Sequence, residues 1–154
     1  TAGILIKGNK SMEAKDLSTD FPRSPRETVG GYVVAGRTLD KCRAQINNSI
    51  GDYHFDCPLD NVFFDFAEIT AEDFKNYVAT GASDDEVGQW IQDNAKKRDK
   101  IDIIKWNNKM RGMRISEMPD PLQEFLEGYI PEFIPQNKIV YVWFDVYDIE
   151  EDRI

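Results

Sequence analysis

The sequence is poor in histidine and cysteine and has no long apolar run. Its 154 residues include one histidine and two cysteines. A structural zinc site uses about four ligands and a disulfide framework uses several cysteine pairs, so neither is expected. The longest apolar run, Ile139–Phe144, has about six residues, against the roughly 20 that cross a bilayer. We therefore expect no metal, no cofactor and no membrane association.

The usual motifs of nucleotide-binding and hydrolytic sites are also missing. The chain contains no G-x-G-x-x-G, P-loop, G-x-S-x-G or H-E-x-x-H pattern. Its net charge of −9 argues against binding nucleic acid. The apolar stretch Ile4–Ile6 is too short for a signal peptide, and two cysteines are compatible with free thiols. A cytoplasmic protein is expected.

The length suits one ordinary domain, and 41% hydrophobic and 31% charged residues are typical of globular proteins. Residues 1–11 differ in character from the rest of the chain, and Met12 is a candidate natural start. We interpret residues 1–11 as an expression-derived leader or an upstream extension, and residues 12–154 as a single compact domain.

Helix-start signals recur along the chain and predict a mainly α fold of about six helices. Ser24-Pro25-Arg26-Glu27 combines a capping serine, proline at the first helical position and a glutamate that can reach back to the cap. We expect a helix from there to about Ile46 or Ser49. Further helices are predicted from Cys57-Pro58, Thr70, Ser83, the region of Ile103, and Asp120.

The C-terminal part contains a segment of ambiguous composition. Ile139–Phe144 is rich in β-branched and aromatic residues, which predicts a short strand or a two-stranded ribbon with Ile4–Ile6. The alternative is a buried segment that leads into a helix at Asp145–Glu151. For residues Pro131–Pro135 we expect a loop.

The first predicted helix carries charges on its apolar side. At 100° per residue, Arg37 and Lys41 lie on the water-facing side. Asp40 and Arg43 instead fall inside the apolar arc, where charges are costly unless paired. Two interpretations stay open: a structural ion pair between these two residues, or the polar floor of a ligand pocket.

A second polar cluster comes after the first helix. It contains Tyr53, His54, Cys57 and Asp60, including the one histidine. Together with Asp40 and Arg43, these residues are our candidate ligand-binding set, with Arg43 holding an anionic group. One alternative is a cysteine-dependent enzyme with Cys57 as nucleophile and His54 as base, which also needs an oxyanion site. Another is a purely structural loop in which Asp60 braces the next helix.

Charge is unevenly distributed along the chain. Residues 96–114 carry 8 basic and 2 acidic side chains, whereas residues 58–95 carry 1 and 9 and residues 115–154 carry 2 and 10. The basic stretch is compensated within the molecule or forms a surface for a protein partner. The candidate partner surface comprises Lys105, Trp106, Lys109 and Arg111.

An ordered series of motifs runs from about Asp16 to Trp90. It comprises Ser24-Pro25-Arg26, Gly30-Gly31-Tyr32, Arg37 with Asp40-Lys41 and Arg43-Ala44, Tyr53-His54, Cys57-Pro58-Leu59-Asp60, and Phe63 to Phe66. The series resembles a bacterial family of small proteins described as a domain of unknown function. The resemblance implies a small, mostly helical, cytosolic bacterial protein and implies no activity.

These observations together favour a non-catalytic module that binds a small molecule or anion, or that interacts with another protein.

Overall fold

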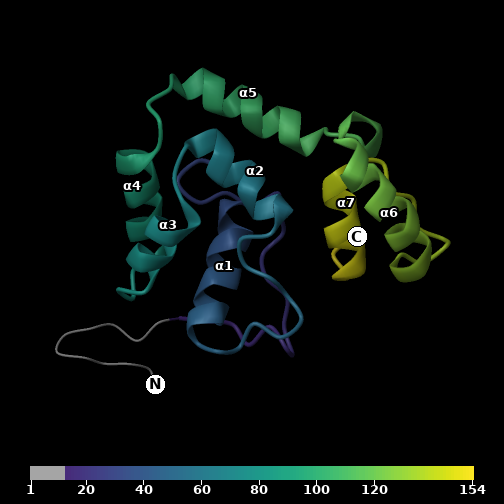
Figure 1. Cartoon of the computed structure of the whole chain (residues 1–154), viewed down its shortest axis with the longest axis horizontal. Coiled ribbons are helices and arrows are strands. Elements are labelled where there is room, and N and C mark those ends of the chain that lie inside the picture. The colour runs from purple at the N-terminus through teal and green to yellow at the C-terminus, as the bar shows by residue number, and fades with distance from the viewer. Residues whose placement is uncertain (1–12) are drawn as a thin grey trace. The chain divides into compact units, whose positions relative to one another are not determined.

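The computed structural model describes residues 13–154, and this part of the chain is mainly helical (Figure 1). It contains seven α-helices, one short 3-10 helix and one isolated β-bridge, which confirms the predicted fold class. The predicted leader, residues 1–11, lies outside the described residues. The chain divides after Asp99 into two compact units, called unit 1 and unit 2 below, and the single domain over 12–154 stays a prediction.

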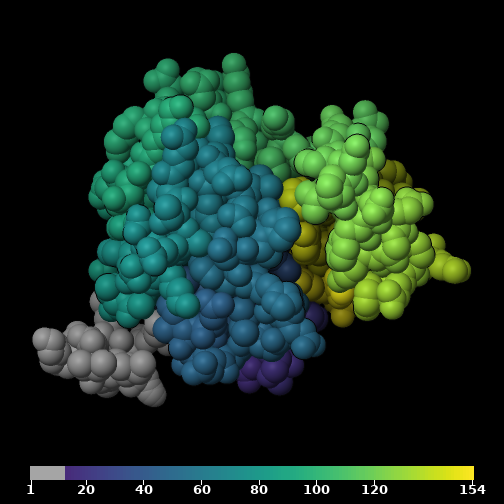
Figure 2. Space-filling view, in the orientation of Figure 1, coloured from purple at the N-terminus to yellow at the C-terminus, as the bar shows by residue number. Residues whose placement is uncertain are grey.

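Unit 1 is built around its first helix. Helix α1 contacts both α2 and α3. In the space-filling view, the blue and teal helices of this unit pack closely against one another (Figure 2). The helices are α1 (Ala35–Ile46), α2 (Pro58–Ala67), α3 (Ala71–Val78) and α4 (Asp84–Asn94).

The prediction that a helix starts at Ser24 was wrong, because α1 begins only at Ala35. The capping contacts do form: the Ser24 N–H donates to Glu27 Oε2 at 3.2 Å, but within an isolated turn. Gly30 and Gly31 have φ of +64° and +89°, which an α-helix does not accept. Gly30 also packs directly on α4, since a Cβ there would lie 2.9 Å from the Gly88 carbonyl oxygen.

The predicted starts of α2, α3 and α4 are confirmed. The hydroxyl of Thr70 accepts from the Asp73 N–H at 3.0 Å, and that of Ser83 accepts from the Glu86 N–H at 3.2 Å. Such side-chain caps satisfy N–H groups that have no partner inside the helix. Local sequence therefore fixes these three helix starts.

An aromatic cluster forms the core of unit 1. Phe63 and Phe74 are fully buried, and Phe64 lies 5.4 Å from Phe63 and 5.5 Å from Phe74 between ring centroids. Phe55, from the loop before α2, stacks on Phe74 at 6.4 Å. Burial of such rings is worth about 1.5–3 kcal/mol each, so the loop is anchored to the core just before Cys57.

Unit 2 contains α5 (Lys100–Arg111), the 3-10 helix Ile115–Glu117, α6 (Asp120–Phe133) and α7 (Trp143–Glu150). Helices α6 and α7 lie side by side (Figure 1). The Tyr129 hydroxyl on α6 donates to the Glu150 carboxylate on α7 at 2.6 Å.

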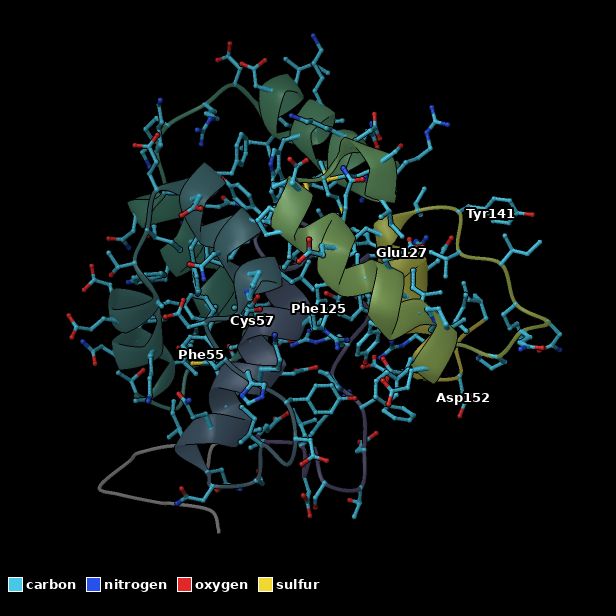
Figure 3. The ribbon with its side chains drawn as sticks, turned by 45° about the vertical axis from the view of Figure 1, so that its right-hand side comes forward. Phe55, Cys57, Phe125, Glu127, Tyr141 and Asp152 are labelled. Carbon is cyan, nitrogen blue, oxygen red and sulfur yellow. The ribbon has the colours of Figure 1, made fainter. Side chains whose placement is uncertain are left out.

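Two expectations for this unit were wrong. Pro131 lies inside α6, which continues to Phe133, so the expected loop begins later. Residues 139–142 form no strand: Ile139 is 63% and Tyr141 71% exposed, and Tyr141 projects outward (Figure 3). The alternative interpretation is right about the helix, which is α7 from Trp143, and wrong about the burial of residues 139–142 before it.

Candidate functional site

Helix α1 buries nearly all of its polar side chains. Arg37 and Lys41 are each only 3% exposed, so the prediction that they face water was wrong. Asp40 and Arg43 are also buried. Because unpaired buried charges are strongly unfavourable, each must find a partner. The partners define two separate polar clusters on α1.

The first cluster, called the arginine–aspartate network below, joins α1 to α4. The Arg23 guanidinium donates to both oxygens of Asp40, at 2.9 and 3.1 Å, and also contacts Asp84 at 2.8 Å. The Arg43 guanidinium donates to Asp84 Oδ1 at 2.8 Å and to the Ala82 carbonyl oxygen at 2.9 Å. The half-exposed Asp84 thus bridges two arginines.

The two arginines of the network change the pKa of Asp84. Partial burial by itself raises the pKa of this carboxyl group. Hydrogen bonds and charges from Arg23 and Arg43 outweigh that effect, and the pKa of Asp84 is lowered from its ordinary value of 3.8. Asp84 therefore stays ionised at neutral pH.

Among the described residues, three open recesses border this network, and Arg43 lines two of them. The first, of about 480 Å³, is lined by Glu13, Arg43, Asp84, Asp85 and residues 81–83. The second, of about 440 Å³, is lined by Glu13, Ala14, Lys15, Arg23, Asp40, Arg43 and Asp84. The buried Nε of Arg43 has no hydrogen-bond partner in the described part of the chain.

The second cluster, called the lysine–cysteine site below, joins α1 to α2. Lys41 Nζ lies 3.0 Å from Asp60 Oδ1 and 3.1 Å from Cys57 Sγ. Asp60 is fully buried and also accepts from the Thr38 hydroxyl at 2.6 Å. Its other oxygen accepts from the Asp56 N–H at 2.9 Å. The lysine is thereby held against the sulfur by a fixed carboxylate.

Local sequence explains why Cys57 stands where it does. Cys57 is the N-cap residue of α2, Pro58 takes the first helical position, and Asp60 occupies the third. Phe55 fixes the preceding loop in the aromatic core, and Figure 3 shows Phe55 and Cys57 near each other at this end of α2. Cys57 is half-buried.

The two other residues of the predicted loop cluster lie apart from the sulfur contact. Tyr53 is half-buried, and the Arg37 guanidinium lies 5.5 Å from its ring centroid. His54 is exposed. The side chain that the structure places on the Cys57 sulfur is Lys41, not His54.

Cys42 differs sharply from Cys57. It is fully buried, and both thiols are free of any disulfide. Burial raises the pKa of the Cys42 thiol to about 12. Cys42 is therefore an inert core residue at physiological pH.

The predicted site residues divide between the two clusters. Asp40 and Arg43 belong to the arginine–aspartate network, and Cys57 and Asp60 belong to the lysine–cysteine site. Sequence reasoning missed four members: Arg23, Thr38, Lys41 and Asp84. Arg23 was not singled out from the sequence, and Asp84 was visible only as a residue of a helix start, because their partners lie 17 and 41 residues away in the chain.

The predicted partner surface lies on α5. Lys105, Lys109 and Arg111 are exposed, and Trp106 is half-buried. The Arg111 guanidinium donates to Asn108 Oδ1 within the same helix at 3.0 Å. A protein partner for this surface stays a prediction.

In the described residues, no helix has the length and apolar character needed to span a membrane. The same residues hold no group of three or more histidine, cysteine or acidic side chains arranged for a metal ion.

The fold and the two clusters define a small, mainly helical protein with ionisable groups buried on one central helix. The chain belongs to the family described as Domain of unknown function (DUF5069), whose model matches residues 19–153. The family resemblance drawn from the motifs is thereby confirmed, and a bacterial origin stays a prediction. Curated proteins provide no match to the chain.

Proposed function

We propose that this protein is a thiol-based sensor in which Cys57 reacts once with a hydroperoxide. The observation that carries the proposal is the 3.1 Å contact between Cys57 Sγ and the buried ammonium of Lys41. A positive charge beside a sulfur, at the N-terminus of a helix, is the environment in which protein thiols act as nucleophiles. Lys41 takes the place of the histidine considered from the sequence alone.

The reaction forms a sulfenic acid on Cys57. A sulfur electron pair attacks the terminal oxygen of the hydroperoxide, an S–O bond forms and the O–O bond breaks. The thiol proton of Cys57 is lost to water before the attack, and the departing alkoxide or hydroxide takes a proton back from water, so a thiol and a hydroperoxide become a sulfenic acid and an alcohol or water. Sulfur is oxidised, and the peroxide is reduced to an alcohol or water. The added oxygen lies beside Lys41 and the first turn of α2, so oxidation perturbs the pairing that joins α1 to α2.

Sensing rather than turnover is favoured by the surroundings of the sulfur. The second cysteine is buried and keeps its proton, so it cannot resolve the sulfenic acid from its core position. Stoichiometric oxidation, reversed by external thiols, needs no resolving cysteine.

The decisive experiment compares two N-cap cysteines in one molecule. Thr70 is the exposed N-cap residue of α3, so Thr70→Cys adds a thiol at a helix start without a Lys41 counterpart. With limiting iodoacetamide at pH 7.5, we expect Cys57 to be labelled about tenfold faster than the added thiol. Peptide mapping by mass spectrometry gives both rates, and Cys42 should stay unlabelled in the folded protein.

A second arm tests the role of Lys41. In the Thr70→Cys background, the joint change Lys41→Met and Asp60→Asn removes both charges of the buried pair, and it should bring the two labelling rates together while circular dichroism shows a retained fold. Hydrogen peroxide followed by dimedone should mark Cys57 in the wild-type protein. Equal labelling rates for the two cysteines before the Lys41 change would rule out the proposed sensor, whether or not the Lys41 variant folds.

A further inference from the structure

We infer that the sulfenic acid of Cys57 condenses with the side-chain nitrogen of Lys41 and forms a sulfenamide bridge, an S–N bond between α2 and α1. The inference rests on the proposed function, because it describes what becomes of the sulfenic acid formed there. All the residues it uses belong to unit 1. The protein would then hold its oxidised state as a reversible covalent link between two helices.

The contact between the two atoms supplies the first argument. Lys41 Nζ lies 3.1 Å from Cys57 Sγ. The Lys41 side chain is 3% exposed, and it is the one lysine that the described part of the chain buries. Groups held in contact by a fold react at effective concentrations that reach about 10⁵ M or more, far above the concentration of any external thiol. Lys41 therefore reaches the oxidised sulfur before other nucleophiles.

The residues around the sulfur remove the usual competitors. A sulfenic acid commonly condenses with a second thiol or with a backbone nitrogen. The next backbone nitrogen belongs to Pro58 and carries no hydrogen, so it cannot form a neutral sulfenamide. The Cys42 thiol is fully buried and keeps its proton, because burial raises its pKa to about 12. Lys41 is thus the nucleophile that the structure holds against Cys57.

Asp60 supplies the base that the reaction needs. Its Oδ1 lies 3.0 Å from Lys41 Nζ and takes one proton from the ammonium, which frees the nitrogen electron pair. This pair attacks the sulfur, an S–N bond forms and the S–O bond breaks. The departing hydroxide takes a second proton from the nitrogen and leaves as water. Sulfur keeps the oxidation state of the sulfenic acid, so the step needs no further oxidant.

The burial of the ion pair favours the bridged state. Before the step an ammonium and a carboxylate are buried together, and after it both groups are neutral. Buried charges are costly to desolvate even when they are paired, so the neutral product suits this interior better. Thiols and dimedone both attack the sulfur of a sulfenamide. The bridge is therefore reversible, and it is compatible with the dimedone label expected above.

The test is the mass of the protein after treatment with hydrogen peroxide. Cys42→Ala removes the one other thiol of the chain, so no disulfide can form within a molecule. We expect the oxidised protein to be about 2 Da lighter than the reduced one, whereas a sulfenic acid is about 16 Da heavier. Dithiothreitol should restore the original mass. Trypsin digestion without reductant should locate the bridge, because cleavage after Lys41 is blocked and residues 38–43 stay joined to the peptide with Cys57.

Two further variants test which groups matter. Lys75→Met changes a half-buried lysine of α3 and is the matched control, in which the bridge should form as before. The joint change Lys41→Met and Asp60→Asn removes the nitrogen and its base. The fraction of oxidised Cys57 that reaches the sulfinic acid should then rise at least about fivefold, because the sulfenic acid is no longer protected by the bridge.

The possible outcomes separate the bridge from the sensor. A product that keeps its added oxygen while trypsin still cleaves after Lys41 would overturn the bridge and leave the sensor standing. A Cys57 that peroxide does not oxidise would overturn both. If Cys42→Ala does not fold, the same digest of the wild-type protein decides, because a disulfide to Cys42 leaves the bond after Lys41 open to trypsin.

Discussion

The pairing of Lys41 with Asp60 is the least tolerant residue-scale feature of the protein. Their side chains are 3% and 0% exposed, with Nζ and Oδ1 3.0 Å apart. Removing one charge of a buried pair leaves the other uncompensated in a poorly polarisable interior. A long aliphatic side chain with a terminal charge is thus kept on α1 only because a fixed carboxylate faces it.

Asp60→Asn should therefore lower the free energy of unfolding by about 3 kcal/mol or more, since it leaves the Lys41 ammonium buried without a counter-charge. Urea unfolding followed by circular dichroism measures the loss. Asp65→Asn, the same substitution at an exposed position of α2, should change stability by less than about 0.5 kcal/mol. Adding Lys41→Met to Asp60→Asn should recover part of the lost stability, because no charge then stays buried alone. If the Asp60→Asn and Asp65→Asn variants have similar stabilities, the ion pair contributes little to folding.

At the residue scale, sequence reasoning located the polar clusters but not their pairings. Helical spacing predicts that the side chains of Asp40 and Arg43 face the core, and both are buried. Their partners come from other elements, however, and a helical projection contains no information on those. The projection puts Lys41 in water because it treats every face of α1 alike, whereas α2 covers the face on which Lys41 lies.

Two helical glycines, Gly88 and Gly128, show that the packing around a helix decides whether a change from glycine to alanine stabilises the protein. Gly88 lies inside α4 with its Cα against the backbone of Gly30, and a Cβ there would meet the Gly30 nitrogen at 3.1 Å. Gly128 lies inside α6 with nothing within 4 Å of a Cβ. Helix propensity favours alanine at both positions by about 1 kcal/mol.

We expect Gly128→Ala to stabilise unit 2 by up to about 1 kcal/mol and Gly88→Ala to destabilise unit 1 by about 1 kcal/mol or more. The two changes in stability have opposite signs because, of these two helices, α4 packs its backbone directly against another backbone at its glycine and α6 does not. Thermal unfolding of both variants measures the difference. An increase in stability for Gly88→Ala would mean that the turn at Gly30 moves away without cost.

Helix starts were the part of the fold most accessible from sequence. Thr70 and Ser83 cap their helices through contacts within three residues, and such contacts need no tertiary partner. The same kind of signal at Ser24 failed because two glycines with positive φ come after it and the backbone turns onto α4. Ile139–Phe144 was ambiguous because a strand needs a neighbour, which composition cannot supply.

On the scale of the whole molecule, the acidic excess sets how stability responds to pH. The net charge is −9 at pH 7 and the isoelectric point is about 4.6, so repulsion between carboxylates weakens as the pH falls toward that value. Below it, carboxylates that are paired in the folded state start to take up protons. Asp84 is such a group, because it bridges Arg23 and Arg43.

Asp84 should make the folded state lose stability in acid. Its pKa in the folded protein lies below the ordinary value of 3.8, so its contribution is fully present above that pH and disappears as the pH falls through the lowered pKa. Because the side chain is 50% exposed, solvent limits this contribution to less than about 1 kcal/mol. Asp84→Asn should consequently be less stable than wild type at pH 6, and the difference should shrink as the pH falls below 3.8.

Urea unfolding at half-unit steps from pH 6 to pH 2.5 measures this convergence. Asp85→Asn removes the same charge from the neighbouring, exposed position and keeps the bridge to the two arginines. The Asp85 variant therefore gives the effect of removing one negative charge while the arginine–aspartate network stays intact. If the Asp84 and Asp85 variants instead converge on wild type in parallel, the acid response belongs to the net charge of the whole molecule and not to the arginine–aspartate network.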